Sequence, residues 1–267
     1  MNIVLHEART LAKSAWIWAV ALCALAALYL SLFSAIARDA ETFMAIFAAY
    51  PAAIQHALGV TLDSVASLPG FYTMVLTFVT LCTAIQATNA GVGILSKEAR
   101  DGTSDFLYTK PVSRFAIVTS KLVAVVLVLL ATDVVYYLVS SFLLIGLANA
   151  PGATKVDPTV FALLDLTILG VQFMMFSVGL AFSLLFRRLR NVLPVSLGLT
   201  FGLYLVGALM PTDDAARWVS PFQYFDLHDI VVNTRFDLGA WGAAGLVFVG
   251  GLVAAYIVTL RRDLHVR

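Results

Sequence analysis

The stretch Leu122–Ala148, LVAVVLVLLATDVVYYLVSSFLLIGLA, contains one acidic residue, Asp133, and no basic residue. A helix of about 20 apolar residues crosses a hydrocarbon core of about 30 Å. Lipid offers no hydrogen bonds to a peptide backbone, so a spanning segment must be a helix or a strand of a closed barrel. The run is too long and too uniformly apolar for a barrel strand, which alternates over about ten residues. It is therefore predicted to be a transmembrane helix.

Five further runs of this kind flank the first. They cover Ala15–Ala37, Gly70–Leu95, Val160–Phe186, Asn191–Met210 and Leu238–Leu260. The composition agrees with them, because 61% of the 267 residues are hydrophobic and 12% are charged, against about 25% charged in a typical soluble domain. The sequence predicts an all-α, polytopic integral membrane protein with six transmembrane helices, in which residues 1–267 form a single transmembrane domain.

The basic residues predict the orientation of these helices. Cytoplasmic loops carry an excess of Lys and Arg, and 13 of the 17 Lys and Arg residues fall in cytoplasmic segments if both termini are cytoplasmic. A seventh uncharged run, Thr42–Leu62, would invert every later loop if it crossed the membrane. We therefore interpret it as an external interfacial helix. Residues 1–14 mix apolar and charged side chains and are predicted to form an amphipathic N-terminal helix along the cytoplasmic face.

Several kinds of site are not indicated by the sequence. The net charge of +1 suggests no nucleic-acid surface, and the four histidines are too scattered to suggest a metal site. Cys23 and Cys82 both lie in apolar runs, where a disulfide is not expected. The phosphate-binding pattern G-x-x-x-x-G-K-[ST] does not occur. We expect no catalytic or metal site and no cofactor bound by this chain.

The long cytoplasmic loop Ser96–Lys121 contains signals for a short helix of its own. Gly102 ends the preceding helix, because glycine readily takes left-handed conformations. Thr103 or Ser104 can cap a new helix, and Pro111 ends it. The segment is predicted to be a short cytoplasmic helix between helices 2 and 3, with Lys121 near the lipid headgroups, and a soluble partner could push it. The alternative is a solvated loop that only connects two spans.

The residues of this loop resemble those of the type-2 (ABC-2-like) permease family of ATP-binding-cassette (ABC) transporters. They read EARDGT at 98–103, FL at 106–107 and KPVSR at 110–114, followed by the lysine at 121. In that family an acidic residue precedes Gly-Thr, and a Pro-x-Ser-Arg turn leads to a lysine at the base of the third helix. The stretch SPFQYFD at 220–226 is similar to the external segment before the family's last helix, and the resemblance covers nearly the whole chain.

The resemblance implies the transmembrane permease subunit of an ABC transporter, in most members an exporter, in the inner membrane of a prokaryote. It implies a second permease copy, identical or related, and two copies of an ABC ATPase subunit that bind the ATP. The short loop helix would then be the coupling helix, and its contact residues would be Glu98, Asp101, Gly102, Thr103, Phe106, Leu107 and Arg114. A subgroup of the family is associated with multicopper-enzyme maturation, but the sequence does not indicate the substrate.

Polar residues inside the predicted spans are candidate substrate-path residues. Asp133 lies twelve residues beyond Lys121, about 18 Å into the membrane, where a charge costs at least about 2.5–3.5 kcal/mol. Gln86 and Asn89 lie about 10–15 Å from the inner end of the second helix. These three residues either line the path, with Asp133 pairing with a substrate cation, or form hydrogen bonds within the bundle. Asp165, near the outer end of the fourth helix, is expected to reach the interface.

Two other functions agree with parts of the pattern. A secondary transporter could use Asp133 as a proton or ion site, although the inverted repeats and broken helices typical of that class are not evident. A membrane enzyme would need convergent catalytic groups, and Asp133 and Asp165 are predicted at different depths.

The segment before the last helix, Pro211–Asp237, is predicted to form short helices that turn back toward the bilayer.

Overall fold

The structure is a computed structural model that describes residues 3–51, 54–55, 58, 67–94, 113–149, 157–185, 191–210 and 218–261. These residues form helices and no strands. Six of the described helices are long and apolar enough to cross a membrane. They are α1 (Ile3–Arg38), α4 (Leu68–Ile94), α7 (Arg114–Ala148), α8 (Pro158–Leu185), α9 (Val192–Leu209) and α11 (Leu238–Arg261). The predicted all-α, polytopic class with six spans is confirmed.

Two helices are longer than the sequence predicted. The amphipathic N-terminal helix and the first span form one continuous helix, α1, of 36 residues. The third long helix, α7, begins at Arg114 rather than at Leu122, and the Ser113 hydroxyl caps it by accepting a hydrogen bond from the Ala116 backbone N–H at 3.2 Å. The 35 residues of α7 extend over about 52 Å, so the helix continues beyond a hydrocarbon core of about 30 Å.

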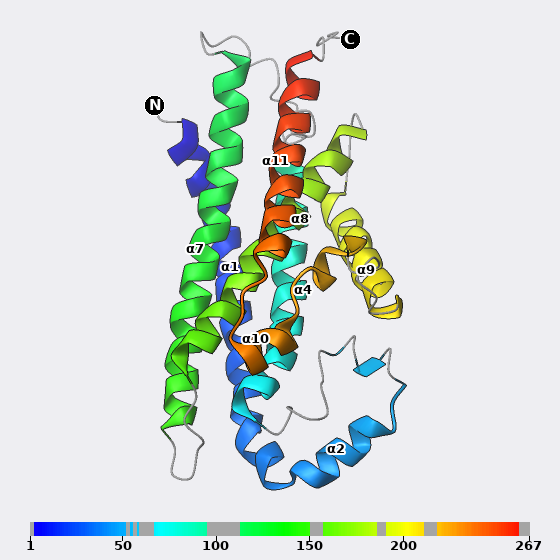
Figure 1. Cartoon of the computed structure of the whole chain (residues 1–267). Helices are drawn as coiled ribbons and strands as arrows, with labels where there is room; N and C mark the ends of the chain where they lie inside the picture. Colours follow the sequence, from blue (N-terminus) through cyan, green and yellow to red (C-terminus); the bar gives the residue numbers. More distant parts are fainter. Residues whose placement is uncertain are drawn as a thin grey trace.

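The interfacial helix predicted over Thr42–Leu62 falls partly outside the described residues, and among the described ones residues 42–48 and 54–55 are helical. The helix observed there, α2, covers Ala40–Ala48 and ends at the turn that leads to Pro51. A proline disfavours helical geometry in the residue before it, so the helix ends ahead of Pro51. In Figure 1, α2 runs across one end of the bundle, while the start of α1 and the end of α11 lie at the other end. An even number of crossings gives this arrangement.

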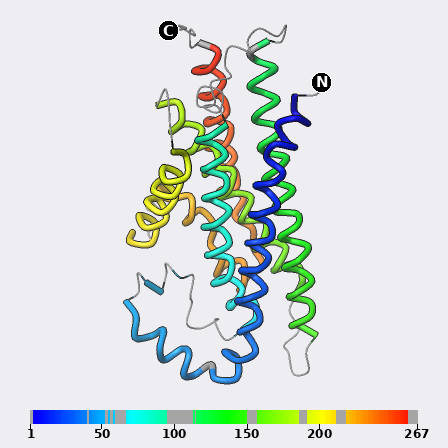
Figure 2. The backbone as a smooth tube through the Cα atoms, turned by 180° about the vertical axis from the view of Figure 1, so that it is seen from behind, coloured from blue at the N-terminus to red at the C-terminus, as the bar shows by residue number. Residues whose placement is uncertain are grey.

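Two helices occupy the centre of the bundle. In the apolar spanning parts of α4 and α8, 72% and 61% of the residues are buried, against 11% in α11. α4 packs mainly against α8, and α1 packs mainly against α7. Figure 2 shows α1 and α7 running alongside each other on one side of the bundle. Large apolar side chains on α11, such as Leu246, Val249 and Val253, are exposed, as lipid-facing side chains are expected to be.

A pair of glycines sets the approach of α4 to α8. A Cβ atom on Gly179 of α8 would lie 2.6 Å from the carbonyl oxygen of Thr88 on α4. A Cβ atom on Gly91 of α4 would overlap the carbonyl oxygen of Phe176 on α8 and lie 2.9 Å from the backbone nitrogen of Leu180. Helices in membranes associate closely where small residues let their backbones meet. These two glycines therefore allow the backbones of α4 and α8 to pack closely against each other.

The segment before α11 contains two short helices, as predicted. The 3₁₀ helix η2 (Pro221–Gln223) is capped by the Ser220 hydroxyl, and α10 (Leu227–Asn233) follows it. Ser220 also donates a hydrogen bond to the Leu203 carbonyl oxygen of α9 at 2.8 Å. The Phe225 ring packs so closely on Gly170 of α8 that a Cβ atom there would overlap it. The segment thus turns back against the long helices.

The start of α8 is held by a carboxylate that precedes it. The backbone N–H and the hydroxyl of Thr159 both donate to the Asp157 carboxylate, at 2.9 and 2.7 Å. These hydrogen bonds hold the pKa of the Asp157 carboxyl below its usual value, with the hydroxyl as the larger cause. A negative charge at a helix N-terminus is favourable, because the first N–H groups of a helix have no partner within it.

Candidate functional site

The predicted coupling helix lies outside the described residues. Arg114 is described only in its backbone, as the first residue of α7. The other residues predicted to contact an ATPase fall within 95–112, a range the structure does not describe: Glu98, Asp101, Gly102, Thr103, Phe106 and Leu107. The two ends of the loop are described, however, and they place it between the last turn of α4 and the first turn of α7.

Lys121 joins these two helices at the base of the loop. It was expected near the lipid headgroups, but only 4% of its surface is exposed, and its ammonium donates a hydrogen bond to the Ile94 carbonyl oxygen at 3.2 Å. Ile94 is the last residue of α4. The last carbonyls of a helix have no partner within it, and a positive charge at that end is favourable. Lys121 therefore holds the end of α4 against α7.

The substitution Lys121→Met tests this contact. It keeps a buried apolar stem and removes the ammonium, and we expect it to lower the free energy of unfolding by about 1–2 kcal/mol because the Ile94 carbonyl loses a donor. Hydrogen exchange measured by mass spectrometry should show faster exchange in the last turn of α4. Lys121→Arg, which keeps the charge, should remain closer to the parent protein. Faster exchange throughout the bundle would contradict a local role.

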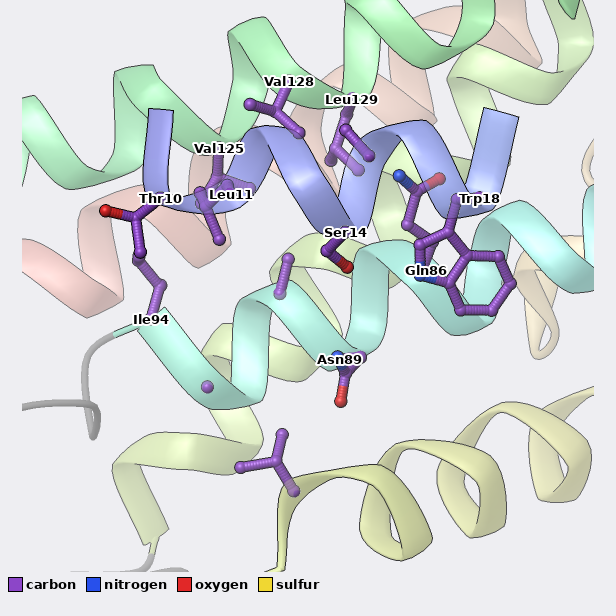
Figure 3. A pocket seen from close by; sticks show the side chains of 14 residues that line it. Thr10, Leu11, Ser14, Trp18, Gln86, Asn89, Ile94, Val125, Val128 and Leu129 are labelled. Carbon is purple, nitrogen blue, oxygen red and sulfur yellow. The ribbon is translucent and has the colours of Figure 1, made fainter. Parts of the chain in front are cut away.

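A cavity of ≈ 220 Å³ lies among α1, α4, α7 and α9. Gln86 and Asn89, two of the three predicted path residues, line it, together with Ser14 and Trp18 of α1. Figure 3 shows that Gln86 points from α4 toward α1 and α7, with Trp18 beside it, whereas Asn89 points toward α9. The structure therefore brings two of the predicted residues to one cavity but directs their amides to different sides of α4.

The third predicted residue, Asp133, contacts α8 instead of lining the cavity. Its Oδ1 atom accepts a hydrogen bond from Nε2 of Gln172 at 3.2 Å, and its buried Oδ2 atom has no partner among the described residues. The preceding residue, Thr132, accepts a hydrogen bond from Nε2 of Gln86 at 3.1 Å. Gln86 and Gln172 are thus held by consecutive residues of α7, in a group that joins α4, α7 and α8.

Gln172 is the residue of this group that the sequence reasoning missed. It lies in the middle of α8 and is fully buried, at 0% exposure. The signal that could have found it is the amide itself, because a polar side chain deep in an apolar span needs a partner. An amide on one helix and a carboxylate on another are natural partners for each other.

A second buried network surrounds Asp165, about 10 Å from Gln172 along α8. The Tyr72 hydroxyl donates to Oδ1 of Asp165, and the Ser140 hydroxyl lies 3.1 Å from Oδ2. The Tyr136 hydroxyl is 3.1 Å from that of Tyr72. The expectation that Asp165 reaches the interface is wrong, since it is 7% exposed and faces α4 and α7. Both carboxylate oxygens have partners, so this network is suited to holding helices together.

The comparison with protein families gives a match that covers most of the chain. The family described as "ABC-2 family transporter protein" matches residues 1–258. The matched range contains the cavity, both buried networks and all but the last residues of α11. The search of curated proteins found no match to the chain.

Proposed function

The chain belongs to the ABC-2 family of transporter proteins, and from that premise we propose that it is the permease of an exporter driven by a separate ATPase. It would work with a second permease copy, identical or related, and with two ATPase subunits, in the cytoplasmic membrane of a prokaryote. ATP would bind to the ATPase and not to this chain. The observation that carries the proposal is a family match that spans nearly the whole chain, which is a multi-pass membrane protein with six long apolar helices among its described residues.

The coupling residues proposed from the sequence are Glu98, Asp101, Gly102, Thr103, Phe106, Leu107 and Arg114. The arrangement of the helices supports a coupling role for their loop, because it connects α4, which packs mainly on α8, with α7, which packs mainly on α1. A push on the loop would therefore act on both helix pairs. The hydrogen bond from Lys121 to Ile94 would help the two ends of the loop to move together.

We also propose that Gln86, Asn89 and Asp133 belong to the substrate path. For Gln86 and Asn89 the support is direct contact with the cavity among α1, α4, α7 and α9. For Asp133 it is the bond between Gln86 and the adjacent Thr132. A small movement of α4 against α7 would alter the surroundings of all three residues, since Gln86 spans the two helices.

The proposed coupling is tested by purification of the chain together with ATPases encoded by neighbouring genes. The parent protein should retain a bound ATPase, and this complex should hydrolyse ATP. Gly102→Leu should lose most of the bound ATPase, because the bulky side chain alters the proposed contact. Gly152→Leu, in the loop predicted on the opposite side of the membrane, is the matched control and should retain the ATPase. The proposal is wrong if the parent protein binds no ATPase. It is also wrong if Gly102→Leu retains as much ATPase, and its complex hydrolyses ATP as fast, as Gly152→Leu does.

A further inference from the structure

The cavity among α1, α4, α7 and α9 has mainly aliphatic walls. Most of its lining residues are Ala, Val, Leu or Ile, and none of the described residues that line it is charged. On α1, Arg9 and Lys13 are sequence neighbours of the lining residues Thr10 and Ser14, but neither lines the cavity itself. A charged group is costly to bury without a partner of opposite charge. The lining therefore favours an uncharged ligand.

The volume of the cavity limits the size of such a ligand. An apolar cavity of about 150 Å³ holds one benzene molecule. In the same proportion, the ≈ 220 Å³ of this cavity accommodates about nine non-hydrogen atoms. Sites for drug-sized ligands begin at about 300 Å³. The cavity therefore suits a small molecule, of about the size of a benzene ring with a short substituent.

The amide of Asn89 is the polar group of the cavity that is free to bind a ligand. Asn89 is half-buried, lines the cavity and points toward α9 (Figure 3). Its side chain has no hydrogen bond to any other described residue, whereas Gln86 donates to Thr132 and the Thr10 hydroxyl donates to the His6 carbonyl oxygen. An asparagine amide has both N–H donors and an acceptor oxygen. A ligand group with a donor and an acceptor of its own therefore matches it.

We propose that this cavity binds a small uncharged molecule in which an apolar body carries a carboxamide, and that Asn89 binds the carboxamide. Two amides can each donate to the other, whereas a carboxylate only accepts hydrogen bonds and an ammonium only donates them. The half-buried ring of Trp18 lines the cavity and offers a face on which an aromatic body can stack. That this molecule is the transported substrate rests on the proposed function, whereas the binding itself does not.

The test measures binding of radiolabelled phenylacetamide to the purified full chain in detergent. Binding should be saturable and should exceed the partition of the label into empty micelles. Unlabelled phenylacetate and phenethylammonium have nearly the same shape but carry a charge. Each should displace the label at least about tenfold less well than unlabelled phenylacetamide does, because the cavity offers no opposite charge among its described lining residues. Propylbenzene, which lacks a polar group, is the fourth competitor.

Three variants locate the binding. Asn89→Leu removes an amide that bonds to no described residue, so the variant should fold as stably as the parent protein. Its ratio of phenylacetamide affinity to propylbenzene affinity should fall at least about tenfold, because only the amide ligand loses a hydrogen-bonded partner. Ala90→Leu adds bulk to the cavity wall and should abolish binding of both compounds. Gly242→Leu on α11, where a Cβ atom would meet nothing within 4 Å, is the matched control for added bulk and should bind like the parent protein.

The contrary results are equally specific. Tighter binding of either charged compound would overturn the assignment of an uncharged ligand. An unchanged affinity ratio in Asn89→Leu would overturn the pairing of Asn89 with the carboxamide. Full binding in Ala90→Leu would place the ligand outside this cavity, and the absence of saturable binding to the parent protein would reject the site altogether.

This experiment is separate from the test of the proposed function. Binding is measured without an ATPase, so Gly102→Leu should bind phenylacetamide as the parent protein does. Binding of phenylacetamide by a chain that retains no ATPase would support the site and reject the ABC mechanism. An ATPase complex that binds no phenylacetamide would support the ABC mechanism and reject the site.

Discussion

Alanine at Gly91 or at Gly179 is expected to destabilise the bundle by at least about 3 kcal/mol, the upper end of the usual cost of overpacking. The added methyl group would meet the backbone of the opposite helix in both cases, at Phe176 from Gly91 and at Thr88 from Gly179. A side chain can rotate away from a clash, but a helical backbone can yield only if the whole helix moves. The central pair α4 and α8 would have to separate, and the buried polar groups between α4, α7 and α8 would lose their alignment.

Other glycines of the chain provide the control for this prediction. A Cβ atom at Gly198 of α9 or at Gly242 of α11 would have nothing within 4 Å. Alanine favours a helix over glycine by about 1 kcal/mol, so Gly198→Ala and Gly242→Ala should be neutral or slightly stabilising. Unfolding midpoints of the four purified variants, together with their yield as monodisperse protein, make the comparison. Equal stability of Gly91→Ala and Gly242→Ala would show that the helices are not held by this contact.

The fold class followed from the sequence because lipid excludes most alternatives. A backbone in hydrocarbon must satisfy its own hydrogen bonds, so each long apolar run could only be a helix. The ends of the helices were less predictable. Lys13 and Lys121 suggested boundaries for the first and third spans, but a lysine does not interrupt a helix, and no Gly or Pro occurs in either junction. The helices therefore continue through both positions as α1 and α7.

The sequence indicated some residues of the candidate site, but not Gln172 and not the pairings between residues. Depth along a helix can be counted, and this predicted Gln86, Asn89 and Asp133 inside the membrane; the structure places Gln86 and Asn89 at one cavity and Asp133 against Gln172. Partners depend on the rotation of each helix about its axis and on the register between helices, which one sequence does not fix. Asp133 bonds to Gln172 of α8, while Tyr136, on the same helix as Asp133, joins the network of Asp165.

The network of Asp165 leads to the second large prediction, a contrast between two substitutions at one position. Asp165→Leu removes both acceptor oxygens while keeping the number and branching of the side-chain heavy atoms. The hydroxyls of Tyr72, Tyr136 and Ser140 would then share too few partners, and we expect a loss of about 2–4 kcal/mol because a buried polar group without a partner costs about 1–3 kcal/mol. Denaturant unfolding of the purified protein measures this loss.

Asp165→Asn should instead lie within about 1 kcal/mol of the parent protein, because each hydrogen bond can be replaced. The asparagine oxygen can still accept from Tyr72, and its NH₂ group can donate to Ser140. The Ser140 hydroxyl is then free to donate to the Tyr137 carbonyl oxygen, which already lies 3.1 Å away. If Asn were as harmful as Leu, hydrogen-bond geometry could not account for Asp165. Its negative charge would be required, and the network would have to be regarded as part of the transport mechanism rather than as a link between helices.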